Sequence, residues 1–187
     1  MRIAVISDVH SNWPALEAVL EDLEGVDDVM CLGDVVGYGG QPLPCLDHLR
    51  GQGWLTLMGN HDQACTDAEA LLWFNADAAA AVRWTAAQLD PDRTRWLSGL
   101  PETATREGAL LVHASPRSHV HEYVLDRFTA AANLELLDGG VCFHGHTHLP
   151  GVFHVEQGKV VHDYRLGPVP LSAPGLVNPG SRLSGLG

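Results

Sequence analysis

The segment Ile3-Ala4-Val5-Ile6-Ser7-Asp8-Val9-His10 begins with four apolar residues and contains two side chains, Asp8 and His10, that can bind a metal ion. A short apolar and β-branched run of this kind is typical of a buried strand. Pro14 suits the first turn of a helix, and apolar residues at helical spacing follow as far as Leu23. A second apolar run at residues 29–32 completes a strand–helix–strand unit. This order predicts a parallel pair of strands with a helix packed over them.

The rest of the chain continues to alternate between expected strands and helices. Residues 66–100 differ, because they are rich in alanine and carry apolar residues on helical faces, so we expect two or three inserted helices there. Residues 152–155 and 160–162 alternate around Gln157-Gly158, which predicts an antiparallel hairpin. The other expected elements are helices at 42–50 and 129–137 and strands at 54–57, 110–112 and 141–143. The tail at 167–187 is rich in Gly and Pro and is assigned no element.

Size and charge limit the classes of function. A length of 187 residues suits one domain, so we expect a single unit over residues 1–187. The chain carries 11 Lys and Arg against 23 Asp and Glu, a formal net charge of −12. Polymeric nucleic acid and anionic membranes attract the opposite sign, so neither is an expected partner. A small anionic substrate is compatible, because bound divalent cations reverse the local field. The oligomeric state stays open.

The chain shows no sign of targeting to a membrane. The amino terminus has too short an apolar run for a signal peptide, and no stretch approaches the ~18 apolar residues that span a bilayer. The four cysteines are scattered without a CxxC pair: Cys31, Cys45, Cys65 and Cys142. We expect them to be free buried thiols in a reducing compartment, which predicts a cytoplasmic protein.

Metal-capable side chains follow the expected strands, usually after a glycine or serine. In an α/β sheet the carboxyl ends of the strands are where loops converge on a ligand. Spacing of i, i+2 in extended chain places Asp8 with His10, and His146 with His148, on the same side. We therefore expect these strand ends to meet at one site. Its candidate ligands are Asp8, His10, Asp34, Asn60, His113, His146 and His148, with His61 and Asp62 directly after Asn60.

The composition of this set favours a pair of metal ions. Two carboxylates, one amide oxygen and four imidazoles, without a thiolate, suit divalent ions such as Mn, Fe, Zn, Co or Ni. A structural zinc site is normally closed by four ligands, so seven ligands imply two ions. Taken singly, each residue has an ordinary explanation: an Asp after a strand is more often a cap, and a lone His is more often a packed residue. The joint occurrence of the set is what favours a site.

These motifs together resemble the signature of the calcineurin-like metallophosphoesterases. The resemblance rests on Asp8-x-His10, Gly33-Asp34-x-x-Gly37, Gly59-Asn60-His61-Asp62, His113 and Gly145-His146-Thr147-His148, with Asn178-Pro179-Gly180-Ser181 near the end. The phrase Gly33-Asp34-Val35-Val36-Gly37-Tyr38-Gly39 is similar to the small bacterial and archaeal phosphodiesterase branch. The fold implied is α/β/β/α: two mixed β-sheets packed face to face and flanked by helices, here with the small helical insert.

The resemblance also implies roles for the residues. Asp8, His10 and His148 would hold one ion, and Asn60, His113 and His146 would hold the other, with Asp34 bridging both. His61 matches a catalytic histidine that contacts the phosphate or protonates the leaving group. Two ions ~3.5–4 Å apart lower the pKa of a bridging water, and the hydroxide attacks the phosphoester in line. Manganese is the first expectation for the ions, with Fe, Zn, Ni or Co as alternatives.

Two departures from the family pattern bear on the substrate. The protein-phosphatase and diadenosine-tetraphosphatase branch carries Gly-Asp-x-x-Asp-Arg-Gly, whose arginine grips phosphate, and Gly-Asn-His-Glu. Here Gly37 and Tyr38 stand in place of that Asp-Arg pair, and Asp62 stands in place of the Glu. The missing arginine favours a phosphodiesterase acting on a small nucleotide-type substrate. Hydrolysis of dinucleoside polyphosphates or of phosphomonoesters is the alternative, and a non-catalytic scaffold on the same fold is the alternative from another class.

Several further residues are weaker candidates. We expect Asp62 to orient an imidazole and His144 to pack or support the site rather than bind metal. Arg117 and Arg182 are candidates for phosphate contact, although a solvated role is the simpler expectation for each. His48, His119, His121, His154 and His162 lie outside the motifs. Three tryptophans of the helical insert, Trp73, Trp84 and Trp96, are expected in its core, with one of them near the site holding a nucleobase as the alternative.

Overall fold

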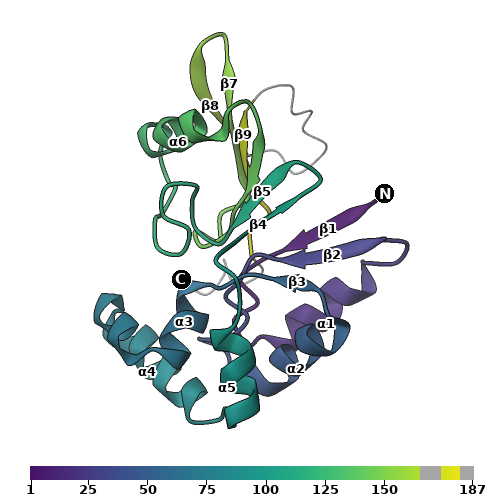
Figure 1. Ribbon diagram of the computed structural model, residues 1–187, viewed down its shortest axis with the longest axis vertical. Coiled ribbons are helices and arrows are strands. Elements are labelled where there is room, and N and C mark those ends of the chain that lie inside the picture. The colour runs from purple at the N-terminus through teal and green to yellow at the C-terminus, as the bar shows by residue number, and fades with distance from the viewer. Residues whose placement is uncertain (165–173, 182–187) are drawn as a thin grey trace.

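The first layer of the fold is the predicted parallel unit. A computed structural model describes residues 1–164 and 174–181. Strands β1 (Ile3–Ile6), β2 (Asp28–Cys31) and β3 (Leu55–Thr56) form a sheet in which each described neighbour runs parallel. Helices α1 (Trp13–Glu21) and α2 (Pro42–Gln52) connect these strands and cover the outer face of the sheet (Figure 1). Both helices begin with Pro in the first turn, where its missing N–H costs no hydrogen bond.

The second sheet mixes parallel and antiparallel strands. Its described strand order is β4-β5-β6-β9-β7-β8. Helix α6 (Arg127–Leu134), extended by a short 3₁₀ turn (Glu135–Leu137), lies on the side of this sheet that faces away from the first sheet (Figure 1). The strands are β4 (Thr103–Arg106), β5 (Ala109–Val112), β6 (Val141–Phe143), β7 (Gly151–Glu156), β8 (Lys159–Asp163) and β9 (Gly175–Asn178).

The two sheets pack face to face, as the strand periodicity requires. Along β2 and the residue after it, Met30 and Leu32 join an apolar cluster with Leu111 of the second sheet, whereas Cys31 between them packs against the helices. Along β6, Cys142 packs on the α6 side and Phe143 faces the first sheet. Alternation with period two thus gives each strand two buried faces. The α/β/β/α arrangement expected from the resemblance is confirmed.

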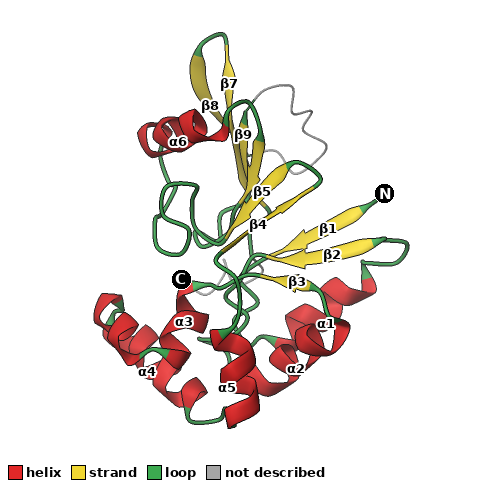
Figure 2. Cartoon of the chain, viewed as in Figure 1, coloured by secondary structure: helices red, strands yellow, loops and turns green. Residues whose placement is uncertain are grey.

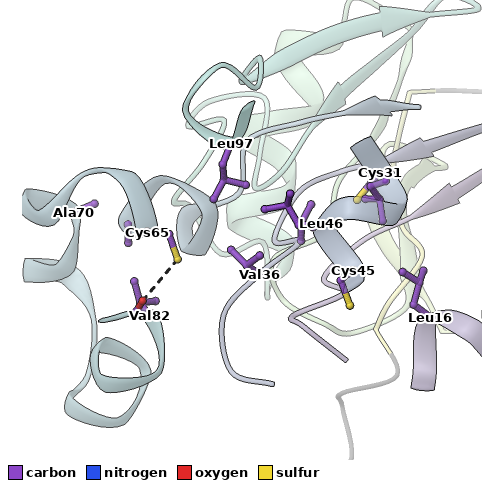
Figure 3. Close-up of a cluster of buried hydrophobic side chains, with 12 residues drawn as sticks. Leu16, Cys31, Val36, Cys45, Leu46, Cys65, Ala70, Val82 and Leu97 are labelled. Carbon is purple, nitrogen blue, oxygen red and sulfur yellow. Dashed lines mark hydrogen bonds between the residues drawn. The ribbon is translucent and has the colours of Figure 1, made fainter. Parts of the chain in front are cut away.

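The helical insert shares its core with the first sheet and its helices. Figure 3 shows Cys65 and Val82 of the insert in one apolar cluster with Leu46 of α2, and Leu97 lies between these groups. The Cys65 thiol donates to the Val82 carbonyl at 3.8 Å. The elements are α3 (Asn60–Thr66), a 3₁₀ segment η1 (Ala68–Trp73), α4 (Ala76–Ala86) and α5 (Pro91–Ser98). The helical region therefore begins at Asn60, six residues before the expected start at 66.

Two strands were missed by the sequence analysis. β4 has the mixed sequence Thr-Ala-Thr-Arg and becomes a strand by pairing with β5 across the turn at Glu107-Gly108. β9 lies in the tail that was assigned no element, where it pairs with both β6 and β7. Each of these strands depends on its partners more than on its own pattern.

The described residues include no helix that is long and apolar enough to cross a membrane. All four cysteines are buried and unpaired, as predicted. Burial raises the pKa of the Cys45 and Cys142 thiols to about 12, so these thiols stay protonated and unreactive at neutral pH.

Candidate metal centre

The candidate ligands lie on loops that leave the strand ends and gather where the two sheets meet. Figure 2 shows the loops after β1, β2 and β3 at the arrowhead ends of these strands, in the middle of the molecule. Six of the seven predicted ligands are buried, and the His148 side chain is 24% exposed. Charged and imidazole groups at this depth need partners or an ion. The structure thus brings the whole predicted set to one place.

One half of the centre contains Asp8, His10 and His148. The Nε2 atoms of His10 and His148 lie 3.0 Å apart. Oδ1 of Asp8 lies 3.4 Å from His148 Nε2 and 3.9 Å from His10 Nε2. These three side chains offer ligand atoms that all lie within 4.8 Å of one another.

The other half contains Asn60, His113 and His146, and Asp34 stands between the halves. Nε2 of His113 lies 3.2 Å from Asn60 Oδ1 and 3.2 Å from His146 Nδ1. Oδ2 of Asp34 lies 3.4 Å from both His10 Nε2 and His113 Nε2. A single carboxylate oxygen therefore faces one imidazole from each half.

The spacing of these atoms fits metal ligation. Two ligand atoms at ~2.1 Å from one ion, at right-angled or tetrahedral geometry, lie ~3.0–3.4 Å apart. The pairs His10–His148, His113–Asn60 and His113–His146 fall within 3.0–3.2 Å. Imidazole nitrogens that carry lone pairs repel at this distance unless a proton or a cation lies between them. The donor set, with nitrogen and oxygen and without thiolate, suits a borderline divalent ion.

Hydrogen bonds on the far side of three imidazoles orient their lone pairs. Nδ1 of His10 donates to the Val36 carbonyl at 3.2 Å, and Nδ1 of His113 donates to the Leu32 carbonyl at 3.0 Å. Nε2 of His146 donates to the carbonyl of His121 at 3.2 Å. Because the outer nitrogen carries the proton, the inner nitrogen is the one available to a metal.

The buried carboxylates give the centre its negative potential. Burial alone would raise the pKa of Asp34, but His113, His61 and His10 outweigh it and hold that pKa well below its usual range. Burial lowers the pKa of His113, yet Asp34 outweighs burial and raises it to about 9. Without a metal, His113 therefore keeps a proton on the nitrogen that faces the centre. A divalent ion bound there would have to displace this proton, so metal binding is expected to weaken as the pH is lowered.

The backbone at five of the ligands is strained. Asp8, His10, Asp34, His146 and His148 all have positive φ, between 47° and 65°. Side chains with a Cβ rarely adopt this region, and each such residue costs on the order of 1–3 kcal/mol. The five strained residues surround the candidate metal centre. The strain therefore indicates that their backbone is constrained by this site rather than by overall stability.

Two glycines allow the ligand loops to approach each other. A Cβ on Gly59 would overlap the carboxylate and the backbone of Asp34. A Cβ on Gly145 would overlap the Ser7 hydroxyl and lie 2.5 Å from Asp8 Oδ2. The motifs Gly59-Asn60 and Gly145-His146 thus need glycine for close approach, as the sequence suggested.

Asp62 plays a different part from the expected one. It accepts backbone N–H groups from Val35 at 3.3 Å, Val36 at 3.1 Å and Gly59 at 3.1 Å. Burial, followed by the charge of Asp34, raises the pKa of Asp62 to about 7. The side chain ties the loop after β2 to the start of α3 and does not orient an imidazole, so that expectation was wrong. An Asp three residues into a helix binds such N–H groups by its position at the helix start.

His61 is not among the seven predicted ligands, but it forms a further group with His10 and Asp34 whose ligand atoms lie within 4.8 Å of one another. Its backbone N–H donates to Asp34 Oδ1 at 2.9 Å. Its ring lies 4.7 Å from that of His10 and 4.8 Å from that of Phe74. Burial holds the pKa of His61 below its usual value. An anionic phosphoryl group close by would favour the protonated form, because opposite charge raises the pKa of an imidazole.

Asn178 supports the turn that carries His146 and His148, although it was not among the predicted site residues. Its Nδ2 donates to the Gly145 carbonyl at 2.8 Å and to Thr147 Oγ1 at 3.0 Å, and its Oδ1 accepts the Gly180 N–H at 2.8 Å. These bonds hold the turn that carries His146 and His148. The signal in the sequence was Asn178-Pro179-Gly180-Ser181, noted above only as part of the resemblance.

Asn178→Ala is expected to lower the affinity for Mn²⁺ by about 10–100-fold, because it frees the turn that positions two ligands. The variant leaves a buried carbonyl without its donor, at a cost of about 1–3 kcal/mol in stability. Isothermal titration with Mn²⁺ and thermal unfolding measure the two effects. Asn133→Ala is the matched control, since Asn133 is equally buried and also makes three hydrogen bonds, away from the site. An equal loss of Mn²⁺ affinity in both variants would contradict this role.

The tryptophans of the insert do not all lie in its core. Trp96 packs against the main apolar cluster, as predicted. Trp73 is 86% exposed and Trp84 is 47% exposed, so the prediction is wrong for these two. Helical spacing shows that a residue faces one side of a helix, but it cannot show whether anything covers that side.

The remaining candidates lie outside the ligand set. His144 is buried, and burial lowers its pKa to about 4. Arg117 pairs with Glu122. Arg182 lies outside the described residues. His121 contributes its backbone carbonyl to His146 although it lies outside the motifs.

Comparison with known proteins shows the family and the fold of the chain. Residues 1–184 match the calcineurin-like phosphoesterase superfamily domain. An uncharacterised protein of Methanocaldococcus jannaschii is 35% identical over 187 residues, covering 96% of this chain and 75% of the relative. A metallophosphoesterase from Sphaerobacter thermophilus is 37% identical, with a TM-score of 0.85 over 97% of this chain and 76% of that one. A hypothetical protein from Pyrococcus horikoshii shares the fold at 16% identity, with a TM-score of 0.74 over 96% of this chain and 88% of that one.

The fold and the clustered aspartates and histidines define a phosphoesterase with metal-capable residues at the strand ends. The chain belongs to the calcineurin-like phosphoesterase superfamily. The family assignment made from the motifs is confirmed.

Proposed function

We propose that this protein is a divalent-metal-dependent phosphodiesterase that uses two ions, with Asp34 as the ligand common to both. The observation that carries the proposal is the position of Asp34 Oδ2, at 3.4 Å from one imidazole of each half. Asp8, His10 and His148 would complete one ion's ligands. Asn60, His113 and His146 would complete those of the other.

Two divalent ions bound there would acidify a water to serve as nucleophile and would neutralise the phosphoryl oxygens. The protein's own residues hold the imidazole ligands in the orientation that metal binding needs. Val36, Leu32 and His121 fix the imidazole tautomers through their carbonyls. Leu32 and Val36 are buried, so the tautomers of His10 and His113 are set before substrate binds.

His61 is the candidate general acid. It lies against His10 and Asp34 but is not needed to complete either half. The phosphoryl anion would raise the pKa of the ring, and the protonated imidazole would then donate to the leaving oxygen. A histidine fits this task because its ordinary pKa lies near neutral pH.

The surroundings of the centre favour a diester. A monoester carries two negative charges at neutral pH, and related sites hold such a group with an arginine. The opening beside His61 and Asn60 has no Lys or Arg among its described lining residues. Tyr38 occupies the corresponding stretch of the loop and lies with its ring 4.5 Å from that of His61. A diester, with one negative charge, needs no further cation beyond the metals.

A panel of phosphoesters tests the proposal. Protein stripped of metal by a chelator is expected to be inactive, and Mn²⁺ is expected to restore hydrolysis, fastest for bis-p-nitrophenyl phosphate. Mg²⁺, Zn²⁺, Co²⁺ and Ni²⁺ should be compared, with p-nitrophenyl phosphate, a cyclic nucleotide and a dinucleoside polyphosphate as the other substrates. Inactivity of every metal-loaded form on the panel would contradict the enzyme proposal and favour a scaffold. Faster hydrolysis of the monoester or the polyphosphate would contradict the diester assignment alone.

A further inference from the structure

A pocket of about 430 Å³ opens directly beside the candidate metal centre. Asn60 and His146 belong to both, and His61 stands at the boundary. The volume is in the range of sites that bind small molecules. The residues that line it are Tyr38, Asn60, His61, Trp73, Phe74, Asn75, Ala78, His121, Tyr123 and His146.

The helical insert contributes one wall of the pocket. Trp73 ends η1 and is 86% exposed, although burying a large apolar side chain is worth roughly 2–3 kcal/mol. Phe74, the next residue, packs its ring edge-on against His61 with centroids 4.8 Å apart. Asn75 then caps α4 by accepting the Ala78 N–H at its Oδ1, so its NH₂ group remains to donate elsewhere. An exposed tryptophan at the rim of a pocket is typical of a contact surface for a ligand.

Two tyrosines from other parts of the chain contribute to the same pocket. The ring of Tyr123 stacks on His146 with centroids 3.9 Å apart and an angle of 30° between the planes. The ring of Tyr38 lies 4.5 Å from that of His61. Both tyrosines are about half exposed, so each presents ring surface as well as a hydroxyl. Aromatic side chains from three separate segments therefore surround a space that adjoins the metal ligands.

The chemistry of the lining selects one kind of group. Its described residues include aromatic rings, imidazoles and amides, and none of them is Asp, Glu, Lys or Arg. Such a wall favours a flat, uncharged group with hydrogen-bonding edges over a charged group or a long alkyl chain. A nucleobase has these properties, and base stacking on aromatic side chains tolerates any base because each has a π face.

We propose that this pocket holds the nucleobase of the phosphoester substrate, with Trp73 as a specificity-determining residue. The proposal rests on the proposed function in that it takes the scissile phosphate to lie at the metal centre. The base would then extend from the phosphate into the pocket between the insert and Tyr123. The helical insert would then contribute to substrate specificity, which the metal-binding motifs do not determine.

Two diesters with the same leaving group test the proposal on Mn-loaded protein. Thymidine 5′-(p-nitrophenyl phosphate) carries a base, and methyl p-nitrophenyl phosphate does not. The native protein is expected to prefer the thymidine ester by tenfold or more in kcat/KM, chiefly through KM. Trp73→Ala is expected to lower kcat/KM for the thymidine ester by about tenfold, the order of one base stack, and to leave the methyl ester unchanged. Trp84→Ala is the matched control, because Trp84 is a partly exposed tryptophan of the same insert outside the pocket.

A binding measurement separates this proposal from the proposed function. Adenosine 5′-monophosphate and ribose 5-phosphate differ by the base, and calorimetry measures their affinities without turnover. Tighter binding of the adenosine compound that is lost in Trp73→Ala and kept in Trp84→Ala would support the pocket, even if no diester were hydrolysed. No preference for the base in the native protein, or an equal preference in Trp73→Ala, would overturn the pocket proposal even if diesters were hydrolysed. An equal loss of kcat/KM for both diesters in Trp73→Ala would also overturn the pocket proposal.

Discussion

Asp34→Asn is expected to lower metal-dependent diester hydrolysis by ~10³-fold or more. Groups that only support a metal ligand cost ~10–100-fold when removed, and Asp34 faces imidazoles from both halves of the centre, so its loss should cost more. The asparagine Oδ1 can still accept the His61 N–H, which Asp34 accepts at 2.9 Å. The substitution therefore removes the charge with little change in shape.

Steady-state hydrolysis of bis-p-nitrophenyl phosphate over a range of Mn²⁺ concentrations measures this effect. Asp77→Asn is the control, since Asp77 is an exposed aspartate in the first turn of α4. Circular dichroism should give the same folded spectrum for both variants. Native rates in Asp34→Asn at any Mn²⁺ concentration would be incompatible with a bridging role for Asp34.

His61→Ala is expected to lower kcat by ~10²–10⁴-fold on a substrate with a poor leaving group, such as a dialkyl or nucleoside diester. A general acid matters most when the leaving oxygen is strongly basic. The loss should therefore be much smaller for p-nitrophenyl esters, whose leaving group departs without a proton. We expect little change in Mn²⁺ affinity, because the two proposed ligand sets, with Asp34 common to both, are complete without His61.

A series of esters with leaving groups of increasing pKa provides the measurement. In the native protein the rate should depend weakly on leaving-group pKa, and in His61→Ala the dependence should be steep. His154→Ala on β7 is the control for loss of a histidine. An equal loss at every leaving group, together with weaker Mn²⁺ binding, would instead make His61 a metal ligand, as its nearness to His10 and Asp34 allows.

Much of the fold could be predicted because its signals are local. The runs at β1 and β2 are apolar enough to require two buried faces, and a strand, a helix and a strand in sequence leave few arrangements. β4 and β9 could not be predicted in this way. β4 holds one apolar residue in four, and β9 is a short run inside the Gly- and Pro-rich tail. Both are strands because they pair with β5, β6 or β7. Strand formation that depends on distant partners leaves a weak trace in the sequence.

The candidate site was also predicted only in part, where its signals are local in the sequence. The i, i+2 spacing predicted that Asp8 lies with His10, and their side chains approach to 3.9 Å. It also predicted that His146 lies with His148, but His146 contacts His113 and His148 contacts His10, because the backbone at these residues has positive φ and is not extended. Their role in binding metal stays a prediction. The partners of Asp62 and the exposure of Trp73 depend on which segments fold against them, so the predictions for both residues were wrong. Asn178 acts on a turn that is about 30 residues away in the chain, which spacing alone does not reveal.

The central claim is that seven residues hold two divalent ions on either side of Asp34. Anomalous X-ray scattering from crystals soaked in Mn²⁺ tests it most directly. We expect two manganese peaks, one beside Asp8, His10 and His148 and the other beside Asn60, His113 and His146, with Asp34 within bonding distance of both. A single peak, or manganese bound away from Asp34, would contradict it.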